Sequence, residues 1–560
     1  MSVAPSAAAL GTAGAEQRLR AARFPPGAPA AAHAAARATT LLSMLALASP
    51  AAGLAFEVSL AWRFGTSPTV DAFRVAALLL TFGQQLFVSQ ILPHTVVPLL
   101  TEYRAAGKEA EGWHVALSLA NLLSFPALLF SLAAFVWAGR IVDLLAPGLA
   151  GEGRATTAMF LRWFLLAYAP MVWGGVAAGI FYARKIFWLP PAVQLANNLF
   201  LVAGILALGR TLGAASLVCG VLLSTVFGLG LYLSRLIPLM RREKVRFPWR
   251  LDPTHPGVRR ALLLALPLLG MVLVMQCGSV ALNRALSRLP SGSLAEFGYV
   301  WKMGWLTLLV PLSLSTVLFP RFAEARFGSG GNEFREICTR ALRMALFLSI
   351  PLACWFAVLR TPLVTVLFLH GAFSAEAAAT AARLFGLLLL AAPGFAAYST
   401  MEKMLYALGK THVPMLAQVA SAALLTAFCG VAAQRAGIAG LMGLAGPVVT
   451  WVVAFILFEV LRRRSQAFRW AEILPSTLRL VALAAASAGI ARQTSLLLAA
   501  VGWPAPFSAV VEIAGGLLAG GSLFAVACLI LQIPEALACA RYLRWAGDAV
   551  ARRAQQAVHP

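Results

Sequence analysis

Several side chains that could bind ions or form hydrogen bonds lie within one apolar stretch, residues 63–104. In chain order they are Asp71, Arg74, Gln84, Gln85, Gln90 and His94. Polar and ionisable groups at membrane depth are costly, so they usually line a water-filled path instead of facing lipid. Pro93 and Pro98 in the same stretch favour an interrupted helix that lines a cavity. This combination is typical of a protein that moves a polar cargo across a membrane.

Two of these residues also have a simpler interpretation. Asp71 and Arg74 are three positions apart at the expected start of a helix, where they would cap the helix and pair at the membrane interface.

Lys302 lies in a later apolar run, and its ammonium group could extend to the outer interface. Alternatively, Lys302 faces the cavity opposite Asp71, where a cation would suit an anionic head group such as a diphosphate.

The composition indicates that these residues belong to a membrane protein. Of the 560 residues, 60% are hydrophobic and 12% are charged, whereas soluble domains contain about 25% charged residues. Fourteen apolar runs are long enough to cross a bilayer, which takes about 20 residues. Their approximate limits are 38–62, 71–101, 113–138, 156–182, 187–209, 212–234, 258–283, 296–319, 341–369, 377–408, 412–434, 438–461, 476–501 and 508–533. We therefore expect an all-α polytopic membrane protein.

The net charge of +24 is explained by orientation in the membrane and not by a nucleic-acid partner. The basic residues are concentrated in short loops between apolar runs. If the N-terminus is cytoplasmic, most of the 45 Lys and Arg residues fall in cytoplasmic tails and loops, including the clusters at 241–244 and 462–464. Because cytoplasmic loops carry an excess of basic residues, we expect a multi-pass protein with both termini in the cytoplasm.

A repeat divides the chain into two similar halves. Tyr182 and Pro190 recur as Tyr406 and Pro414, 224 residues later. Six helices per copy would give two parallel lobes around a central cavity. The expected divisions are a disordered basic cytoplasmic tail (1–37), an N-lobe (38–240), a basic cytoplasmic linker (241–257), a C-lobe (258–461), two further helices (462–533) and an amphipathic cytoplasmic tail (534–560).

The sequence lacks the motifs of catalysis and of cofactor binding. Gly409-Lys410-Thr411 is similar to the end of a phosphate-binding loop, but the required glycine is replaced by Met404. The seven histidines and seven cysteines have neither metal-ligand nor disulfide spacing. No paired acid and base or activated nucleophile is evident. We therefore expect no enzyme activity, no cofactor and no metal.

Several short motifs occur in a characteristic order. The early ones are Phe64-Gly65, Asp71-Ala72-Phe73 and Val97-Pro98-Leu99-Leu100-xx-Tyr103. The later ones are Asn283-Arg284-Ala285-Leu286, Leu318-Phe319-Pro320, Gly371-Ala372-Phe373 and Leu405-Tyr406-Ala407-Leu408-Gly409. Over roughly residues 40–460, the chain resembles the MurJ/MviN lipid II flippases in the order and spacing of these motifs.

The resemblance implies the fold of the multidrug/oligosaccharidyl-lipid/polysaccharide exporters, with fourteen helices, two six-helix lobes and a central cavity. It also implies that the protein moves lipid II, an undecaprenyl-diphosphate-linked peptidoglycan precursor, from the inner to the outer leaflet of a bacterial inner membrane by alternating access. The expected partners are this lipid-linked glycan, the membrane and proteins of cell-wall synthesis.

The chain departs from the family at the arginines expected to grip the diphosphate. Those positions fall on Pro50, Phe56 and Gln84, with Lys302 in the eighth helix, whereas Asp71 is retained. The eleventh helix also has no acidic residue that could hold a coupling sodium ion. The candidate substrate-binding residues are Asp71, Arg74, Gln84 and Lys302. The thinner cationic cluster leaves two alternatives, an exporter of another lipid-linked oligosaccharide for capsule or exopolysaccharide, and a transport-inactive membrane scaffold.

Overall fold

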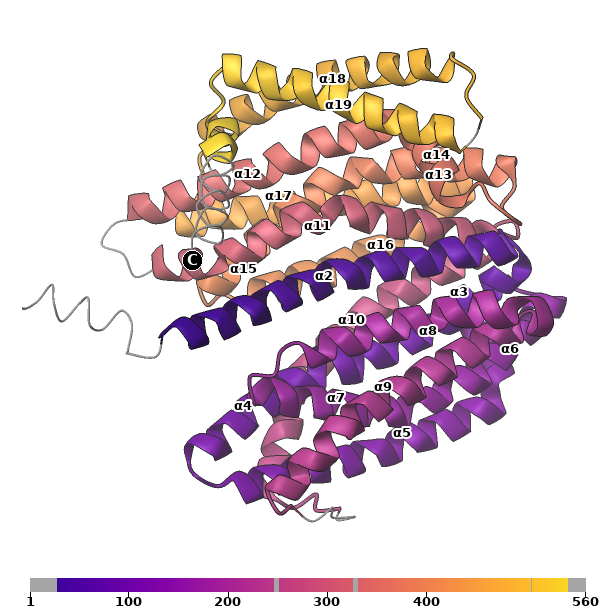
Figure 1. Cartoon of the computed structure of the whole chain (residues 1–560), viewed down its shortest axis with the longest axis vertical. Coiled ribbons are helices and arrows are strands. Elements are labelled where there is room, and N and C mark those ends of the chain that lie inside the picture. The colour runs from indigo at the N-terminus through magenta and orange to yellow at the C-terminus, as the bar shows by residue number, and fades with distance from the viewer. Residues whose placement is uncertain (1–27, 246–250, 326–330, 505, 542–560) are drawn as a thin grey trace, which may run out of the picture.

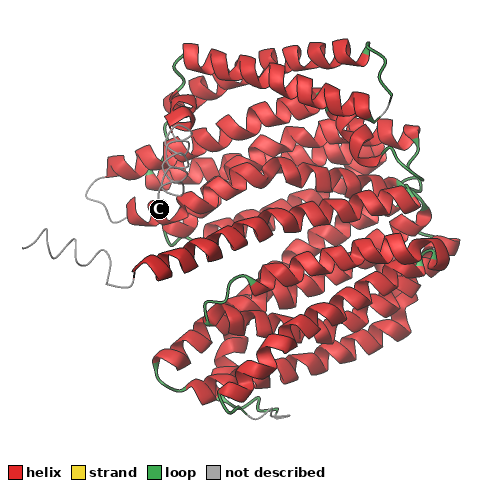
Figure 2. Ribbon diagram, in the orientation of Figure 1, coloured by secondary structure: helices red, strands yellow, loops and turns green. Residues whose placement is uncertain are grey.

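The computed structural model describes residues 28–245, 251–325, 331–504 and 506–541. Throughout these ranges the secondary structure is helical and contains no strand (Figure 2). Of the described helices, eleven are long and apolar enough to cross a membrane, or twelve if the bent pair in 293–324 forms one span. The all-α polytopic prediction is confirmed, whereas the exact number of fourteen spans stays a prediction.

The first half of the chain contains a long helix followed by several broken ones. Its elements are α2 (Ala28–Phe64), α3 (Pro68–Gly83), η1 (Gln84–Gln90), α4 (Ile91–Ala105), α5 (Glu109–Leu145), α6 (Gly151–Phe164), η2 (Leu165–Ala167), α7 (Tyr168–Ala183), α8 (Leu189–Leu212) and α9 (Ala215–Arg242). Residues 28–37 are helical, although we expected them within a disordered tail. Their alanine-rich sequence explains the difference, because alanine has the highest helix propensity. The rest of that expected tail, residues 1–27, lies outside the described residues.

The second half repeats this plan and adds two helices. Its elements are α10 (Pro256–Ser287), α11 (Ser293–Ala325), α12 (Gly331–Val358), α13 (Arg360–Phe368), α14 (Ala375–Leu388), η3 (Leu389–Ala391), α15 (Ala392–Ala407), α16 (His412–Gly440), η4 (Leu441–Ala445), α17 (Gly446–Ser465), α18 (Trp470–Ala499) and α19 (Phe507–Ile530). The short breaks η2 and η3 have the same sequence, Leu-Leu-Ala, and are 224 residues apart. This spacing agrees with the repeat.

The two halves lie side by side as separate helical layers. In Figure 1 the helices α3 to α9 form the lower layer, the helices from α11 onward form the upper one, and α2 runs between them. One apolar cluster lies within the first half and includes Trp113 and Phe181. A second lies within the second half, around Phe322 and Phe458. A third cluster, which includes Phe73 and Tyr299, contains residues of both halves. A movement of the halves would therefore repack this shared cluster, while the other two change little.

The predicted interruption of the second span occurs at η1, just before the prolines. Residues Gln84–Gln90 form a π-helix, and the α-helix resumes at Ile91. Such π segments are rare and often mark functional sites. The neighbouring α7 approaches η1 so closely that a Cβ atom on Gly175 would lie 1.9 Å from the Phe87 carbonyl oxygen. A glycine is therefore required where these helices cross.

Candidate functional site

Asp71 connects the two halves of the chain. Its side chain is 3% exposed, and its two carboxylate oxygens accept hydrogen bonds from the backbone N–H groups of Gly292, at 2.6 Å, and Ala295, at 2.8 Å. Both donors lie at the N-terminus of α11, where the helix dipole favours a negative charge. Asp71 therefore caps a helix, as the simpler interpretation proposed, but the helix is α11 and not its own.

Arg74 lies one helical turn further along and pairs with Glu57 of α2. Nη1 of Arg74 is 3.0 Å from Oε1 of Glu57, and Nη2 contacts the other carboxylate oxygen. The two side chains are only 15% and 8% exposed. The guanidinium also lies over the ring of Tyr299, 5.1 Å from its centroid. Such a two-pronged contact is a strong form of ion pair, and it occupies Arg74 in place of the expected Asp71 partner.

Further contacts close this end of the molecule, which is the predicted outer end. The Tyr299 hydroxyl donates a hydrogen bond to the Gly65 carbonyl at 2.8 Å, and Ala372 N–H donates to the Trp62 carbonyl at 2.8 Å. Gly65 has a φ of +59°, and a Cβ atom there would lie 2.4 Å from the Ala372 carbonyl oxygen. Only glycine fits this conformation and this close approach. We call this set of contacts, together with Asp71, the outer seal.

A central cavity of about 730 Å³ lies between the halves, below the outer seal. Helices α3, α10, α11, α15 and α16 and the segment η1 line it. Its polar wall includes Arg74, Gln85, Gln276, Glu402, Lys403 and Gln418. The cavity therefore carries both signs of charge together with carboxamides, and it can accept an anionic group near Arg74 and Lys403.

Glu402 is the centre of a hydrogen-bond network in this cavity. One of its carboxylate oxygens accepts from the hydroxyls of Tyr398, at 3.3 Å, and Tyr406, at 3.0 Å, and from the amide of Gln418, at 3.0 Å. The sequence analysis used Tyr406 only as a marker of the repeat and of the family motifs, and it did not select Glu402. Glu402 could have been selected from the sequence, because a carboxylate within an apolar run is itself an indication of function.

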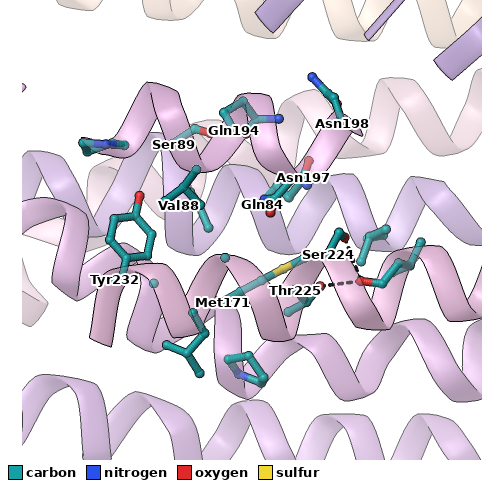
Figure 3. Close-up of a pocket in the computed structure, with 18 of the residues that line it drawn as sticks. Gln84, Val88, Ser89, Met171, Gln194, Asn197, Asn198, Ser224, Thr225 and Tyr232 are labelled. Carbon is teal, nitrogen blue, oxygen red and sulfur yellow. Dashed lines mark hydrogen bonds between the residues drawn. The ribbon is translucent and has the colours of Figure 1, made fainter. Parts of the chain in front are cut away.

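Gln84 does not face the central cavity. It lines a polar pocket inside the first half, between η1, α7, α8 and α9 (Figure 3). Figure 3 shows Gln84 beside Asn197, with Ser224 and Thr225 on the opposite wall. Gln85, the next residue, lines the central cavity. We call the polar space around Gln84 the N-lobe pocket.

Lys302 lies against α2 and away from the outer seal. A Cβ atom on Gly53 of α2 would lie 2.9 Å from the Lys302 ammonium nitrogen and 3.7 Å from the Asn198 amide nitrogen. No carboxylate of the described residues is within 4.0 Å of the ammonium group. The four predicted residues thus occupy four places, with Asp71 in the seal, Arg74 at the cavity wall, Gln84 in the N-lobe pocket and Lys302 beside α2. Their assignment to substrate binding stays a prediction.

Comparison with known proteins extends over both halves of the chain. A family model described as "Lipid II flippase MurJ" matches residues 60–504. The lipid II flippase MurJ of Burkholderia cenocepacia is 27% identical over 379 residues, which cover 64% of this chain and 72% of that protein. The probable lipid II flippase MurJ of Rhizobium meliloti is 28% identical over 491 residues, covering 85% of this chain and 89% of that protein.

Solved structures show the same fold. A lipid II flippase MurJ in an inward closed conformation superposes with a TM-score of 0.74 and 18% identity, covering 88% of this chain and 99% of that one. An inward-facing multidrug resistance MATE family transporter of the MOP superfamily gives a TM-score of 0.64 and 15% identity, covering 76% and 98% of the two chains. The helical fold is therefore shared with these two structures.

Proposed function

The chain belongs to the lipid II flippase MurJ family, and from this premise we propose that it moves lipid II from the inner to the outer leaflet of the bacterial inner membrane by alternating access. The observation that carries the proposal is the central cavity between the two halves. This cavity has cationic residues on its wall and the outer seal at one end. A cargo with a charged head group needs such a polar compartment to cross the hydrocarbon region.

The contacts of the outer seal support alternating access as the mechanism. They join elements that belong to different halves, such as Asp71 on α3 and the start of α11, and they lie beside an apolar cluster that contains residues of both halves. Opening the outer end would break these contacts and part the shared apolar cluster, while the clusters that lie mainly within each half stay packed. The lipid tail of the cargo would remain in the bilayer while the head group passes through the cavity.

The diphosphate of the cargo is best placed near the cations of the central cavity. Arg74 and Lys403 both line it, and guanidinium and ammonium groups form strong charge-assisted hydrogen bonds with phosphate oxygens. In the closed state Glu57 occupies Arg74, so an incoming diphosphate would compete with this carboxylate. Lys302, beside α2, is a further cation that the cargo could reach when the halves move.

A second cargo is favoured by one specific observation. The family position expected to carry an arginine in the second helix is Gln84, and this residue lies in an uncharged pocket. A weaker cationic clamp would suit a lipid-linked oligosaccharide other than lipid II, such as a capsule or exopolysaccharide precursor.

Complementation tests the proposal directly. The chain is expressed in a bacterium depleted of its own lipid II flippase, and survival and outer-leaflet lipid II are measured. Rescue is the expected result. Absence of rescue, with the protein abundant in the membrane, contradicts lipid II as the cargo, and export of labelled capsule precursor then tests the second one. If neither cargo moves, the chain is a transport-inactive scaffold.

A further inference from the structure

The N-lobe pocket continues into a larger chamber toward the predicted cytoplasmic end. The chamber has a volume of about 590 Å³. It shares Ser89, Gln194 and Tyr232 with the pocket and adds His94 and Tyr182. No Asp, Glu, Lys or Arg is found among the described residues that line either space. Apart from the imidazole of His94, the polar groups that line this cavity are neutral, unlike those of the central cavity.

The carboxamides of the pocket are only partly engaged by the protein. The Asn198 amide donates to the Ser49 carbonyl at 3.1 Å, and the hydroxyls of Ser224 and Thr225 bond to the backbone of their own helix (Figure 3). The Oδ1 atom of Asn197 is buried, and no group of the described chain donates to it. Buried polar atoms without a partner are costly. Because the protein encloses this atom, a ligand would reach it only after the Asn197 side chain turns, whereas Gln194 is exposed and lines the chamber directly.

Gln84 and Gln85 show how this space is separated from the central cavity. They are consecutive residues of the π-helix η1, yet Gln84 lines the N-lobe pocket and Gln85 lines the central cavity. One backbone segment thus forms the wall between an uncharged space and a charged one.

We propose that the N-lobe pocket and its chamber bind a neutral saccharide, the glycan part of the cargo. Sugar hydroxyls both donate and accept hydrogen bonds, and so do the carboxamides of Gln84, Gln194 and Asn197. The rings of Tyr182 and Tyr232 and several prolines provide apolar surface for the C–H faces of a sugar. The chamber volume lies within the range of about 300–1,000 Å³ that is usual for small-ligand sites. No Lys or Arg is found among the described residues that line this space to hold a diphosphate.

That the sugar is part of the cargo rests on the proposed function. The binding experiment does not depend on that function, because it uses a soluble sugar. The full-length protein in lipid nanodiscs is titrated with two probes, the uncharged disaccharide N,N′-diacetylchitobiose and farnesyl diphosphate, which carries no sugar. Ligand-observed saturation-transfer NMR detects the weak binding expected of a soluble sugar. We expect binding of the disaccharide to the unmodified protein, and binding that persists in the presence of farnesyl diphosphate.

Variants locate the site. Gln84→Leu and Gln194→Leu should each weaken disaccharide binding about tenfold, because each removes hydrogen bonds to the sugar. Farnesyl diphosphate binding should be unchanged in both. The matched control is Gln85→Leu, the same substitution one residue along and on the other side of the wall, which should bind the disaccharide normally. Gln194 is exposed to the chamber, so its variant should fold even if Gln84→Leu does not.

Two results would overturn the proposal. The first is a folded, unmodified protein that does not bind the disaccharide, which would mean that the pocket holds only water. The second is a loss of disaccharide binding in Gln85→Leu together with normal binding in Gln194→Leu, which would place the sugar in the central cavity. If complementation fails but disaccharide binding depends on Gln194, the cargo differs from lipid II while the saccharide site stands.

Discussion

A carboxylate oxygen of Asp71, in the first half of the chain, lies 2.6 Å from the backbone nitrogen of Gly292, in the second half. The other oxygen accepts from Ala295 at 2.8 Å. The acid is therefore occupied by the start of α11 in this conformation and is not presented to a cargo. Because the two residues belong to different halves, this contact must break whenever the outer end opens.

The Asp71→Asn substitution tests this role. Asparagine keeps one acceptor oxygen but loses the charge and the second acceptor, so the outer seal should weaken and residues 291–297 should exchange their amide hydrogens faster. Hydrogen exchange followed by mass spectrometry measures this change. The control is Asp143→Asn, since Asp143 is 55% exposed and pairs with Arg154 within the first half. Similar exchange of 291–297 in both variants would contradict the role of Asp71 in the seal.

The ion pair between Arg74 and Glu57 gives one prediction about stability and one about transport. Glu57→Leu leaves a largely buried guanidinium without its partner, which costs on the order of 3 kcal/mol, and thermal unfolding in detergent should show the loss. Adding Arg74→Leu to this variant should recover most of the stability, because the unpaired charge is gone.

The same double variant distinguishes a role of Arg74 in stability from a role in transport. Transport should be absent in it, since Arg74 is proposed to contact the diphosphate. If the stabilised double variant supports growth of a flippase-depleted bacterium, Arg74 serves the fold alone and the proposed contact with the cargo is wrong.

The fold was largely predictable from the sequence, whereas the arrangement of the site was not. Apolar runs and the repeat indicate where helices lie, because burial in lipid requires length and hydrophobicity. The direction of a side chain depends on local helix geometry, which a pattern does not show. Gln84 and Gln85 line different cavities because consecutive residues of a helix point in different directions. Which of the two faces which cavity depends on how η1 packs, and the sequence pattern does not show this.

The sequence also did not predict which charged residues have partners on other elements. Glu57 and Arg74 lie on different helices, and Asp71 meets residues more than 200 positions away. The sequence suggested the nearest partner, Arg74 for Asp71, because neighbours on one helix are easily recognised. Tertiary packing instead gives each charge a partner on another element, and only the three-dimensional structure reveals it.

The crossing of η1 and α7 gives a prediction about packing. A methyl group on Gly175 would meet the Phe87 carbonyl oxygen at 1.9 Å, and backbone at this distance must move. Gly175→Ala should therefore lower stability by about 1–3 kcal/mol, as overpacking usually does, and should shift the π segment that carries Gln84.

Thermal unfolding and the amount of protein in the membrane report the effect. The control is Gly230→Ala in α9, where no atom lies within 4 Å of the added carbon. Its stability should equal or slightly exceed that of the unmodified protein, because alanine favours helices. A harmless Gly175→Ala would mean that the two helices are further apart than described.

Glu402 gives the last prediction, which concerns the central cavity. Its carboxylate accepts three hydrogen bonds, from Tyr398, Tyr406 and Gln418. The bond from Gln418 joins α15 to α16, and the two from tyrosines lie within α15. Glu402→Ala removes the common acceptor, so we expect transport to fall about tenfold or more, since two or more such bonds are lost. Lipid II appearance in the outer leaflet is measured at matched protein levels.

The control is Glu512→Ala on α19, where the carboxylate accepts from Ser495 and Ser508 within the added helices and lies outside the described cavity lining. Equal transport by the two variants would show that the Glu402 network has no part in moving the cargo.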